Sequence, residues 1–503
     1  MAAMFIACLP QDFMTRFPLL NLLILSFFPE NAGASLLLST LGQCDTLVRK
    51  SVRPYRMPVP GGAAPVMNSL RGRAGSFTWN SCLLLAVVFA GYLVFGLSEN
   101  IKGPAIPRMQ ADLRISEFQV GLLLAFNSLG YLIACSFTGL LVRKLGMRAT
   151  TVASFGAMAV SGLFIWASSG FFSLSAAYFF LYIGNGALEI VLSLLGARIF
   201  TRNAGTMMNL AHFFYGLSSM AAPLAAAYLM AFRPGDGGPL GWGGMYALVM
   251  ALSILPAIPA LLARFPGKET PEDPASAGKQ EAEPDGPAAA GGLSVRQYAR
   301  DPVAWFVVAI LSAGVVAEMA FGGWLPAFLE KAYRWDGTAA SAMLSGFFVC
   351  FTAARLVLGP FTDRIGLIRS ILIFSLFSGL CTIAAVFAGE PGAWLFALAG
   401  AGIAPIYPTV MAFLAVRYAG RSDAAITFTV TMLGFASVAG NLLIGAITDG
   451  FGRLFGSSGS GEMRGMQAGF LFIGLCALLC ALAAALLLRH LKNRKAAPAR
   501  SGF

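Results

Sequence analysis

Long apolar runs recur along this chain, and each is long enough to cross a bilayer as a helix, which takes about 20 mainly apolar residues. There are twelve of them, in two groups of six. They cover residues 79–101, 118–142, 149–169, 172–198, 205–232, 241–264, 303–329, 339–362, 368–389, 392–416, 423–449 and 467–488. Only 12% of the residues are charged, against about 25% in soluble domains. The sequence therefore predicts an all-α polytopic membrane protein with twelve transmembrane helices in two six-helix, pseudo-symmetric halves.

The two groups of runs predict an N-terminal bundle at residues 76–264 and a C-terminal bundle at residues 302–489. Between them, residues 265–301 are rich in Pro, Gly, Ala, Glu and Asp. Such a composition cannot bury a core, so we expect a solvated linker. Residues 490–503 form a basic tail.

The first 75 residues contain one apolar stretch of only about ten residues, too short to span a membrane. Several prolines surround it. We expect residues 1–75 to be a disordered extension outside the working protein, with Met67 as an alternative start. A secretory signal is the other reading, although no clean charged region precedes the apolar stretch.

Basic residues are distributed unevenly between the loops. Loops on one side, with the C-terminal tail, hold 19 Lys or Arg, and loops on the other side hold seven. Because Lys and Arg collect in cytoplasmic loops, we expect both termini and the linker to lie in the cytoplasm, with the protein in the cell membrane. The net charge of +12 then reports topology and gives no reason to expect nucleic acid. We expect a monomer.

The two halves share a motif after their second span. The first copy runs from Gly139 to Arg148, and the second runs from Gly359 to Arg369, 220 residues later. Internal repeats of this kind build many transporters.

These paired motifs resemble the signature of the major facilitator superfamily: Gly, three residues, an acid, a base, one residue, Gly and a base. The resemblance implies that both copies help to hold the halves together at the cytoplasmic gate. In the first copy, Arg143 stands in place of the acid. The matching residues are Gly139, Lys144, Gly146 and Arg148 in the first copy, and Gly359, Asp363, Arg364, Gly366 and Arg369 in the second.

Within that superfamily, the chain resembles the fucose permease branch, which carries sugars together with protons. The similarity covers roughly residues 80–488 in pieces. The matching stretches are Asn185–Glu189, Met208–His212, Ala317–Trp324, Ala354–Arg355 and Ile406–Thr409.

The chain departs from this branch in its first span. The acid that the branch carries there would fall near Gly103, which cannot ionise. Glu99 and Lys102 lie one helical turn apart nearby.

Five polar residues lie deep in predicted spans. At 1.5 Å per residue, Glu189, His212, Arg355 and Tyr407 lie roughly 12–15 Å from the inner ends of their helices, and Glu318 roughly 22 Å. Lipid cannot solvate such groups, so they should face an internal cavity.

The charged members of this set have two readings each. Glu189 is either a proton carrier or hydroxyl acceptor, or a static partner of Lys102 or Arg355. Glu318 faces the same choice. His212 is either a satisfied core histidine or part of the proton path, since histidine titrates near neutrality. Arg355 stays charged, so it is either permanently paired or faces an anion.

The uncharged candidates are considered next, and some of them have a purely structural alternative. Asn185 and Tyr215 are expected to bind substrate hydroxyls. Trp324 and Tyr407 either pack or offer a ring face to a sugar, and Tyr407 precedes a proline where a helix kinks. Asn441 is the weakest candidate, because a single amide in a span often serves only an interhelical hydrogen bond.

The sequence thus predicts a secondary active transporter, with proton-coupled symport of a small polar solute such as a sugar favoured by the resemblance. An efflux antiporter for drugs or metabolites is the main alternative, and a non-transporting membrane sensor is a further one. We expect no enzymatic activity, because no nucleophile–base–metal set is visible. No CxxC or His/Cys cluster suggests a metal site, and no cofactor is expected.

Overall fold

The computed structural model describes the two predicted bundles and parts of the segments that join them. The described residues are 79–200, 204–235, 237–266, 295–418, 422–456 and 459–496. They belong to one unit, Phe77–Phe503. The expectations for residues 1–75, for the linker at 267–294 and for the tail at 497–503 lie outside the described residues.

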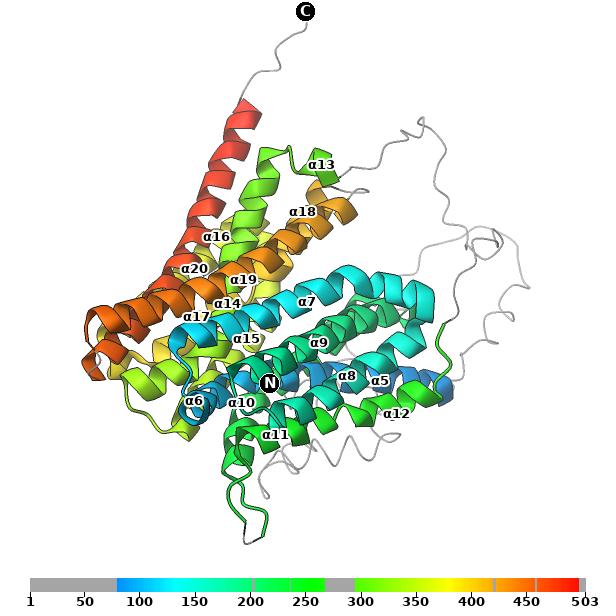
Figure 1. The fold of residues 1–503 in the computed structure, drawn as a ribbon. Coiled ribbons are helices and arrows are strands. Elements are labelled where there is room, and N and C mark those ends of the chain that lie inside the picture. Colours follow the sequence, from blue (N-terminus) through cyan, green and yellow to red (C-terminus); the bar gives the residue numbers. More distant parts are fainter. Residues whose placement is uncertain are drawn as a thin grey trace, which may run out of the picture. The chain divides into compact units, whose positions relative to one another are not determined.

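Twelve described helical segments are long and apolar enough to cross a membrane, as predicted (Figure 1). The N-terminal half contains α5 (Trp79–Asn100), α6 (Lys102–Leu113), α7 (Glu117–Leu145), α8 (Met147–Trp166), α9 (Phe171–Ile199), α10 (Ala204–Ala231), α11 (Gly241–Ala251) and α12 (Ile254–Leu262). The C-terminal half contains α13 (Val295–Tyr298), α14 (Pro302–Ala332), α15 (Gly337–Ile365), α16 (Leu367–Ala388), a 3₁₀ turn (Glu390–Gly392), α17 (Trp394–Ile403), α18 (Ile406–Arg417), α19 (Ser422–Leu454) and α20 (Gly459–Ala496).

The first span is longer than predicted. We expected it to end at residue 101, but after an interruption α6 continues it to Leu113. Ile101 keeps helical angles and its amide still bonds to the Leu97 carbonyl at 3.1 Å. Pro104 has no amide hydrogen, so the Asn100 carbonyl lacks its helical donor, which interrupts the span beside Lys102.

The tenth span is also interrupted, between Ile403 and Ile406. The sequence placed a kink at Tyr407 and Pro408, and the observed break lies slightly earlier. Neither Pro405 nor Pro408 has an amide hydrogen, so two successive turns of this span each lose one backbone bond. This leaves the carbonyl oxygens of Ala401 and Ala404 without their helical donors in the middle of the span.

The two halves meet mainly at one end. We call the end where α12 finishes and α14 begins the linker end, and the opposite end the far end. One buried apolar cluster takes side chains from both halves, among them Ile106 and Val120 from the first and Phe328 and Phe470 from the second. The two other clusters of described residues each belong to a single half, and one of them, around Val307, lies at the linker end. The cores are therefore joined at the far end and separate at the linker end.

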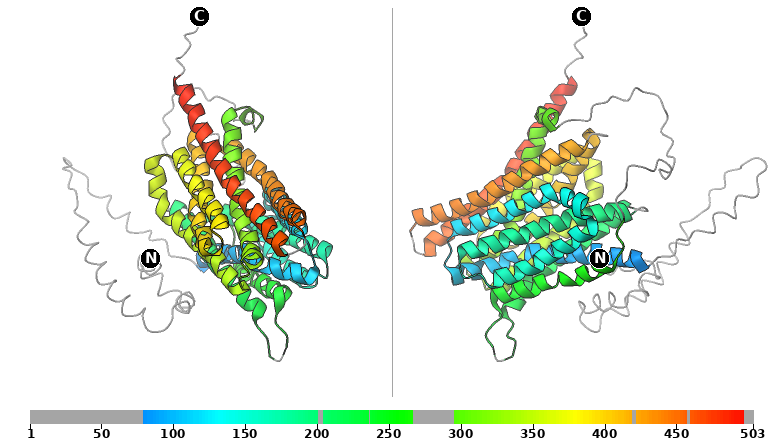
Figure 2. Two further views of the ribbon diagram at one scale, coloured as in Figure 1. Left: turned by 90° about the vertical axis from the view of Figure 1, so that its left-hand side faces the viewer. Right: turned by 45° about the vertical axis from the view of Figure 1, so that its right-hand side comes forward.

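The ribbon shows the same arrangement. α7 runs beside α19, and toward the linker end the C-terminal half diverges from α7 and α9 (Figures 1 and 2). α10 packs on α15, and α6 packs on α14. These three pairs of helices form the seam between the halves.

Candidate functional site

A small cavity lies on the seam between the halves and contains several of the predicted site residues. Its walls come from α5, α6 and α10 on one side and from α14 and α15 on the other. The lining residues are Glu99, Asn100, Lys102, Tyr215, Glu318, Met319, Gly322 and Phe348. The cavity is thus shared between the two halves.

A buried ion pair stands on the N-terminal wall. Lys102 Nζ donates to Glu99 Oε1 and, at 2.9 Å, to the hydroxyl of Tyr182. That hydroxyl lies 3.2 Å from the same Glu99 oxygen, to which it donates. Only 8% of the Lys102 side chain and 9% of the Glu99 side chain are exposed. Lys102 therefore pairs with Glu99, and the alternative in which it pairs with Glu189 is not seen.

A second ion pair stands on the C-terminal wall. Arg355 Nη2 lies 3.8 Å from Glu318 Oε1, and the guanidinium lies 4.3 Å from the ring centre of Phe351. The charge on Arg355 therefore has a partner, which fits the paired reading of this residue.

The main chain fixes the position of Arg355. Its Nε donates to the carbonyl oxygen of Ala404 at 3.2 Å. In a regular helix that oxygen would accept from residue 408, which is Pro408 and has no amide hydrogen. The broken span therefore supplies the acceptor that anchors the guanidinium.

Glu189 has a hydroxyl partner. It accepts a hydrogen bond from Tyr131 of α7. One turn closer to the linker end, Ser193 lies 3.1 Å from the hydroxyl of Tyr92, and the Tyr92 ring lies 4.9 Å from that of His212. Ser193, Tyr92 and His212 thus form a chain of contacts one helical turn from Glu189 on the N-terminal half.

Tyr407 lies in α18 of the C-terminal half. It is 37% exposed. Of the two aromatic residues predicted to stack on a solute, it is therefore the accessible one in this conformation.

Trp324 does not offer its ring here. It is fully buried in the apolar cluster at the far end, and its indole nitrogen has no hydrogen-bond partner among the described residues. Its role as a stacking platform stays a prediction; in this conformation it packs in the same cluster as Phe321, Leu325 and Phe328 of α14.

Two predicted amides form hydrogen bonds with serine hydroxyls on other helices. Asn185 is buried, accepts from Ser98 at 3.1 Å, and leaves its amide nitrogen without a partner among the described residues. Asn441 donates to Ser128 of the other half at 3.2 Å. Asn441 therefore belongs to the seam and makes the interhelical bond that was its alternative reading.

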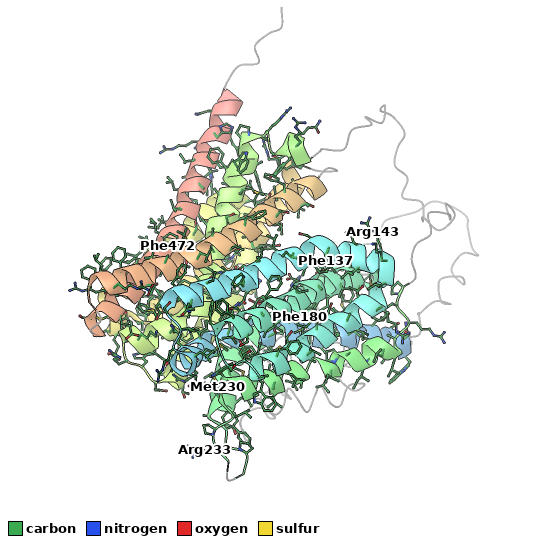
Figure 3. The ribbon with its side chains drawn as sticks, viewed as in Figure 1. Phe137, Arg143, Phe180, Met230, Arg233 and Phe472 are labelled. Atoms are coloured by element: carbon green, nitrogen blue, oxygen red, sulfur yellow. The ribbon has the colours of Figure 1, made fainter. Side chains whose placement is uncertain are left out.

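The two signature motifs form the same turn in both halves. Gly146 and Gly366 have φ of 88° and 95°, and each ends one helix and begins the next. Arg148 donates to the carbonyl of Leu261 within its own half. Arg143 lies at the linker end of α7 (Figure 3). The matching motif residues with exposed side chains are Lys144, Arg148, Arg364 and Arg369; the burial of Gly359 and of the Asp363 side chain lies outside what the structure describes. Their role as a gate stays a prediction.

Charged residues at the far end join the halves. Arg108 Nη1 lies 2.7 Å from Glu330 Oε2. The next residue, Lys331, pairs with Glu117 of α7 and, at 3.4 Å, with Glu462 of α20. Two consecutive residues at the end of α14 therefore pair with the N-terminal half: the acidic Glu330 with Arg108, and the basic Lys331 with Glu117. We call these contacts the far-end latch.

Glycines let the helices of the two halves approach closely at this end. A Cβ on Gly103 would lie 2.5 Å from the carbonyl oxygen of Gly322, and one on Gly121 would lie 2.8 Å from the Cα of Gly445. Any side chain at these positions would push the halves apart.

Sequence reasoning missed four hydroxyl partners of the predicted residues: Tyr131, Tyr182, Ser98 and Ser128. Tyr182 could have been found, because it lies three and seven residues before Asn185 and Glu189 on the same helical face. Tyr131, Ser98 and Ser128 have no such signal, since their partners are on other helices.

The sequence matches the family profile described as Major Facilitator Superfamily over residues 88–342 and 315–502. No curated protein sequence matches the chain with significance. Among solved structures, a bacterial homolog to the human lysosomal transporter Spinster, inward-facing and unoccupied, is 16% identical with a TM-score of 0.66, over 82% of this chain and 99% of that chain. A D-xylose-proton symporter is 14% identical with a TM-score of 0.61, over 80% and 96%. The E. coli fucose:proton symporter is 18% identical with a TM-score of 0.52, over 80% and 98%.

Proposed function

Because this chain belongs to the Major Facilitator Superfamily, we propose that it is a secondary active transporter that couples movement of a small polar solute, such as a sugar, to protons. The observation that carries this proposal is the cavity on the seam, with Glu99 and Lys102 on one wall and Glu318 on the other. In this conformation the cavity is only about 10 Å³ in volume, so a solute would enter between its two walls as the halves rock apart. Because such a solute touches both halves, the rocking moves its access from one end of the molecule to the other.

The proposed cycle starts from the conformation of this structure, closed at the far end. The excess of basic residues favours the linker end as the cytoplasmic one. On that assignment the far-end latch closes the outer side, and solute and proton leave into the cytoplasm. Opening at the far end then breaks the latch and the glycine contacts and exposes the cavity outward.

The solute class follows from the chemistry of the cavity. Each of its two walls carries a charge that is already paired within its own half, Glu99 with Lys102 and Glu318 with Arg355. A net-neutral solute disturbs neither pair, whereas its hydroxyls can bond to the carboxylate oxygens and to Asn100 and Tyr215. This supports a sugar-like solute.

Uptake into proteoliposomes that contain a pH-sensitive dye tests this proposal. The panel contains fucose, D-xylose, a nucleoside and a lipophilic cationic dye. Accumulation of a sugar with acidification of the lumen supports symport. Expulsion of the cationic dye with opposite proton flow would instead establish the efflux antiporter.

The far-end latch gives a prediction about the balance of conformations. Arg108→Glu and Glu330→Arg are each expected to weaken closure at this end by roughly 0.2–1 kcal/mol, the range of partly exposed ion pairs. The 45% exposure of the Arg108 side chain sets this limit. A cysteine placed at Met319, in a background without native cysteines, should become more reactive to an impermeant maleimide added at the far side.

The control is the double reversal, which restores an ion pair with the charges exchanged. It should return the labelling rate toward that of the unchanged protein. Equal labelling of both single variants and the parent would show that the latch does not bias closure.

A further inference from the structure

The Glu99–Lys102 pair differs from the other charges around the cavity because both members belong to one interrupted span. They lie three residues apart, across the break at Ile101. A pair within one span keeps its partners when the halves rock, whereas the latch must open. The pair is therefore a fixed part of the cavity wall.

Its surroundings leave Glu99 no other cation. The titratable groups that face it are Lys102 on α6, Tyr182 and Glu189 on α9, Tyr215 on α10, Tyr246 on α11 and Glu318 on α14. α15 also packs on α6 and contributes Phe348 to the cavity, and its Arg355 pairs with Glu318. α12 packs on α5 and has no titratable residue. Among the described residues, Lys102 alone forms an ion pair with Glu99.

When the charges around the cavity are paired, one carboxylate has no cationic partner. Glu99 has Lys102 and Glu318 has Arg355. Glu189 has the hydroxyl of Tyr131, which can hydrogen-bond to the carboxylate or to the neutral acid. Of the three carboxyl groups in this part of the described structure, Glu189 is the one without a cationic partner at salt-bridge distance.

We propose that Lys102 is a built-in counter-cation that prevents Glu99 from carrying a proton, so that Glu189 is the only one of these three carboxyl groups that binds the coupling proton. This inference rests on the proposed proton coupling. In the step, the Glu189 carboxylate takes one proton at one end and releases it at the other, and no proton is exchanged at Glu99.

Removing the counter-cation should convert Glu99 into a second proton site. With Lys102→Gln, the buried Glu99 carboxylate would lose its cation and keep only the Tyr182 hydroxyl as a donor, which favours the neutral acid. Glu99 lines the cavity, so it can exchange this proton during the cycle.

Infrared difference spectroscopy on the full protein in lipid vesicles, between acidic and alkaline buffer, tests this without any solute. The unchanged protein should show one carbonyl-stretch band from a protonated buried carboxyl, and Glu189→Gln should remove it. Lys102→Gln should add a second band of similar size, which the double variant Glu99→Gln with Lys102→Gln should lack. Lys102→Arg, which keeps the cation, should show one band.

The double variant also covers the case in which Lys102→Gln does not fold, because its neutral pair buries no charge. It should retain the band of Glu189. A band that survives Glu189→Gln and disappears in the double variant would overturn the proposal, as would the absence of any such band or an unchanged spectrum in folded Lys102→Gln. Failure of every panel solute to enter vesicles, with the infrared pattern intact, would count against the solute class alone.

Discussion

Replacing Glu189 by Gln is expected to abolish solute accumulation driven by a pH gradient while leaving solute exchange intact. Glutamine keeps the shape and can still accept from Tyr131, but it cannot take up or release a proton. One pH unit supplies about 1.4 kcal/mol per proton, or roughly tenfold accumulation. The variant should fall to a ratio of about one, because without proton coupling only equilibration remains. Uptake of labelled fucose into vesicles with an imposed gradient measures this ratio.

The matched control is Glu390→Gln. Glu390 accepts from the indole of Trp335 at 2.9 Å, on the far-end turn outside the cavity. This variant should accumulate solute like the parent. Accumulation by Glu189→Gln at the parent's level would refute the proton-carrying role of Glu189, and loss of exchange as well would indicate a role in solute binding.

Replacing Gly103 by Leu is expected to prevent closure at the far end. Its new Cβ would meet the carbonyl of Gly322, the side chain of Leu344 and the ring of Pro326. Overpacking of this kind costs roughly 1–3 kcal/mol, which corresponds to a shift of about 5- to 150-fold in the ratio of two conformations. Transport should fall by a comparable factor, and labelling of a cysteine at Met319 from the far side should rise.

Gly156→Leu is the control for the effect of leucine in a membrane helix. Gly156 lies in α8, and a Cβ there meets nothing within 4 Å. It should transport at the rate of the parent. If Gly103→Leu leaves far-side labelling unchanged, then the contact with Gly322 does not hold the closed state.

The spans were predictable because length and hydropathy are properties of each segment alone. The twelve runs and their division into two halves follow from the need to satisfy backbone groups in lipid. The exact breaks were harder to predict. The prolines at positions 104, 107, 405 and 408 each predict one missing backbone hydrogen bond. The sequence does not show which of these missing bonds interrupts a span. That depends on which neighbour can satisfy the freed carbonyl.

Contacts of the candidate site within one span could be predicted from the sequence, whereas contacts between helices could not. The turn that joins Glu99 to Lys102 is visible in the sequence, and the two residues do pair. The partners of Glu189 and Glu318 were not predictable, because Tyr131 and Arg355 reach them from other helices. Depth along a helix places residues at the same level, while the rotation of each helix about its axis decides which of them meet.

The anchor of Arg355 has a consequence for the genetics of this protein. Its acceptor is the main-chain oxygen of Ala404, so no exchange of the side chain at that residue removes the acceptor itself. Replacing Pro408 by any other residue supplies an amide hydrogen. That amide can donate to the Ala404 carbonyl as in a regular helix and so compete with Arg355 for it. A selection for suppressors that loosen Arg355 should therefore return changes of Pro408, a residue whose own side chain donates nothing to the guanidinium.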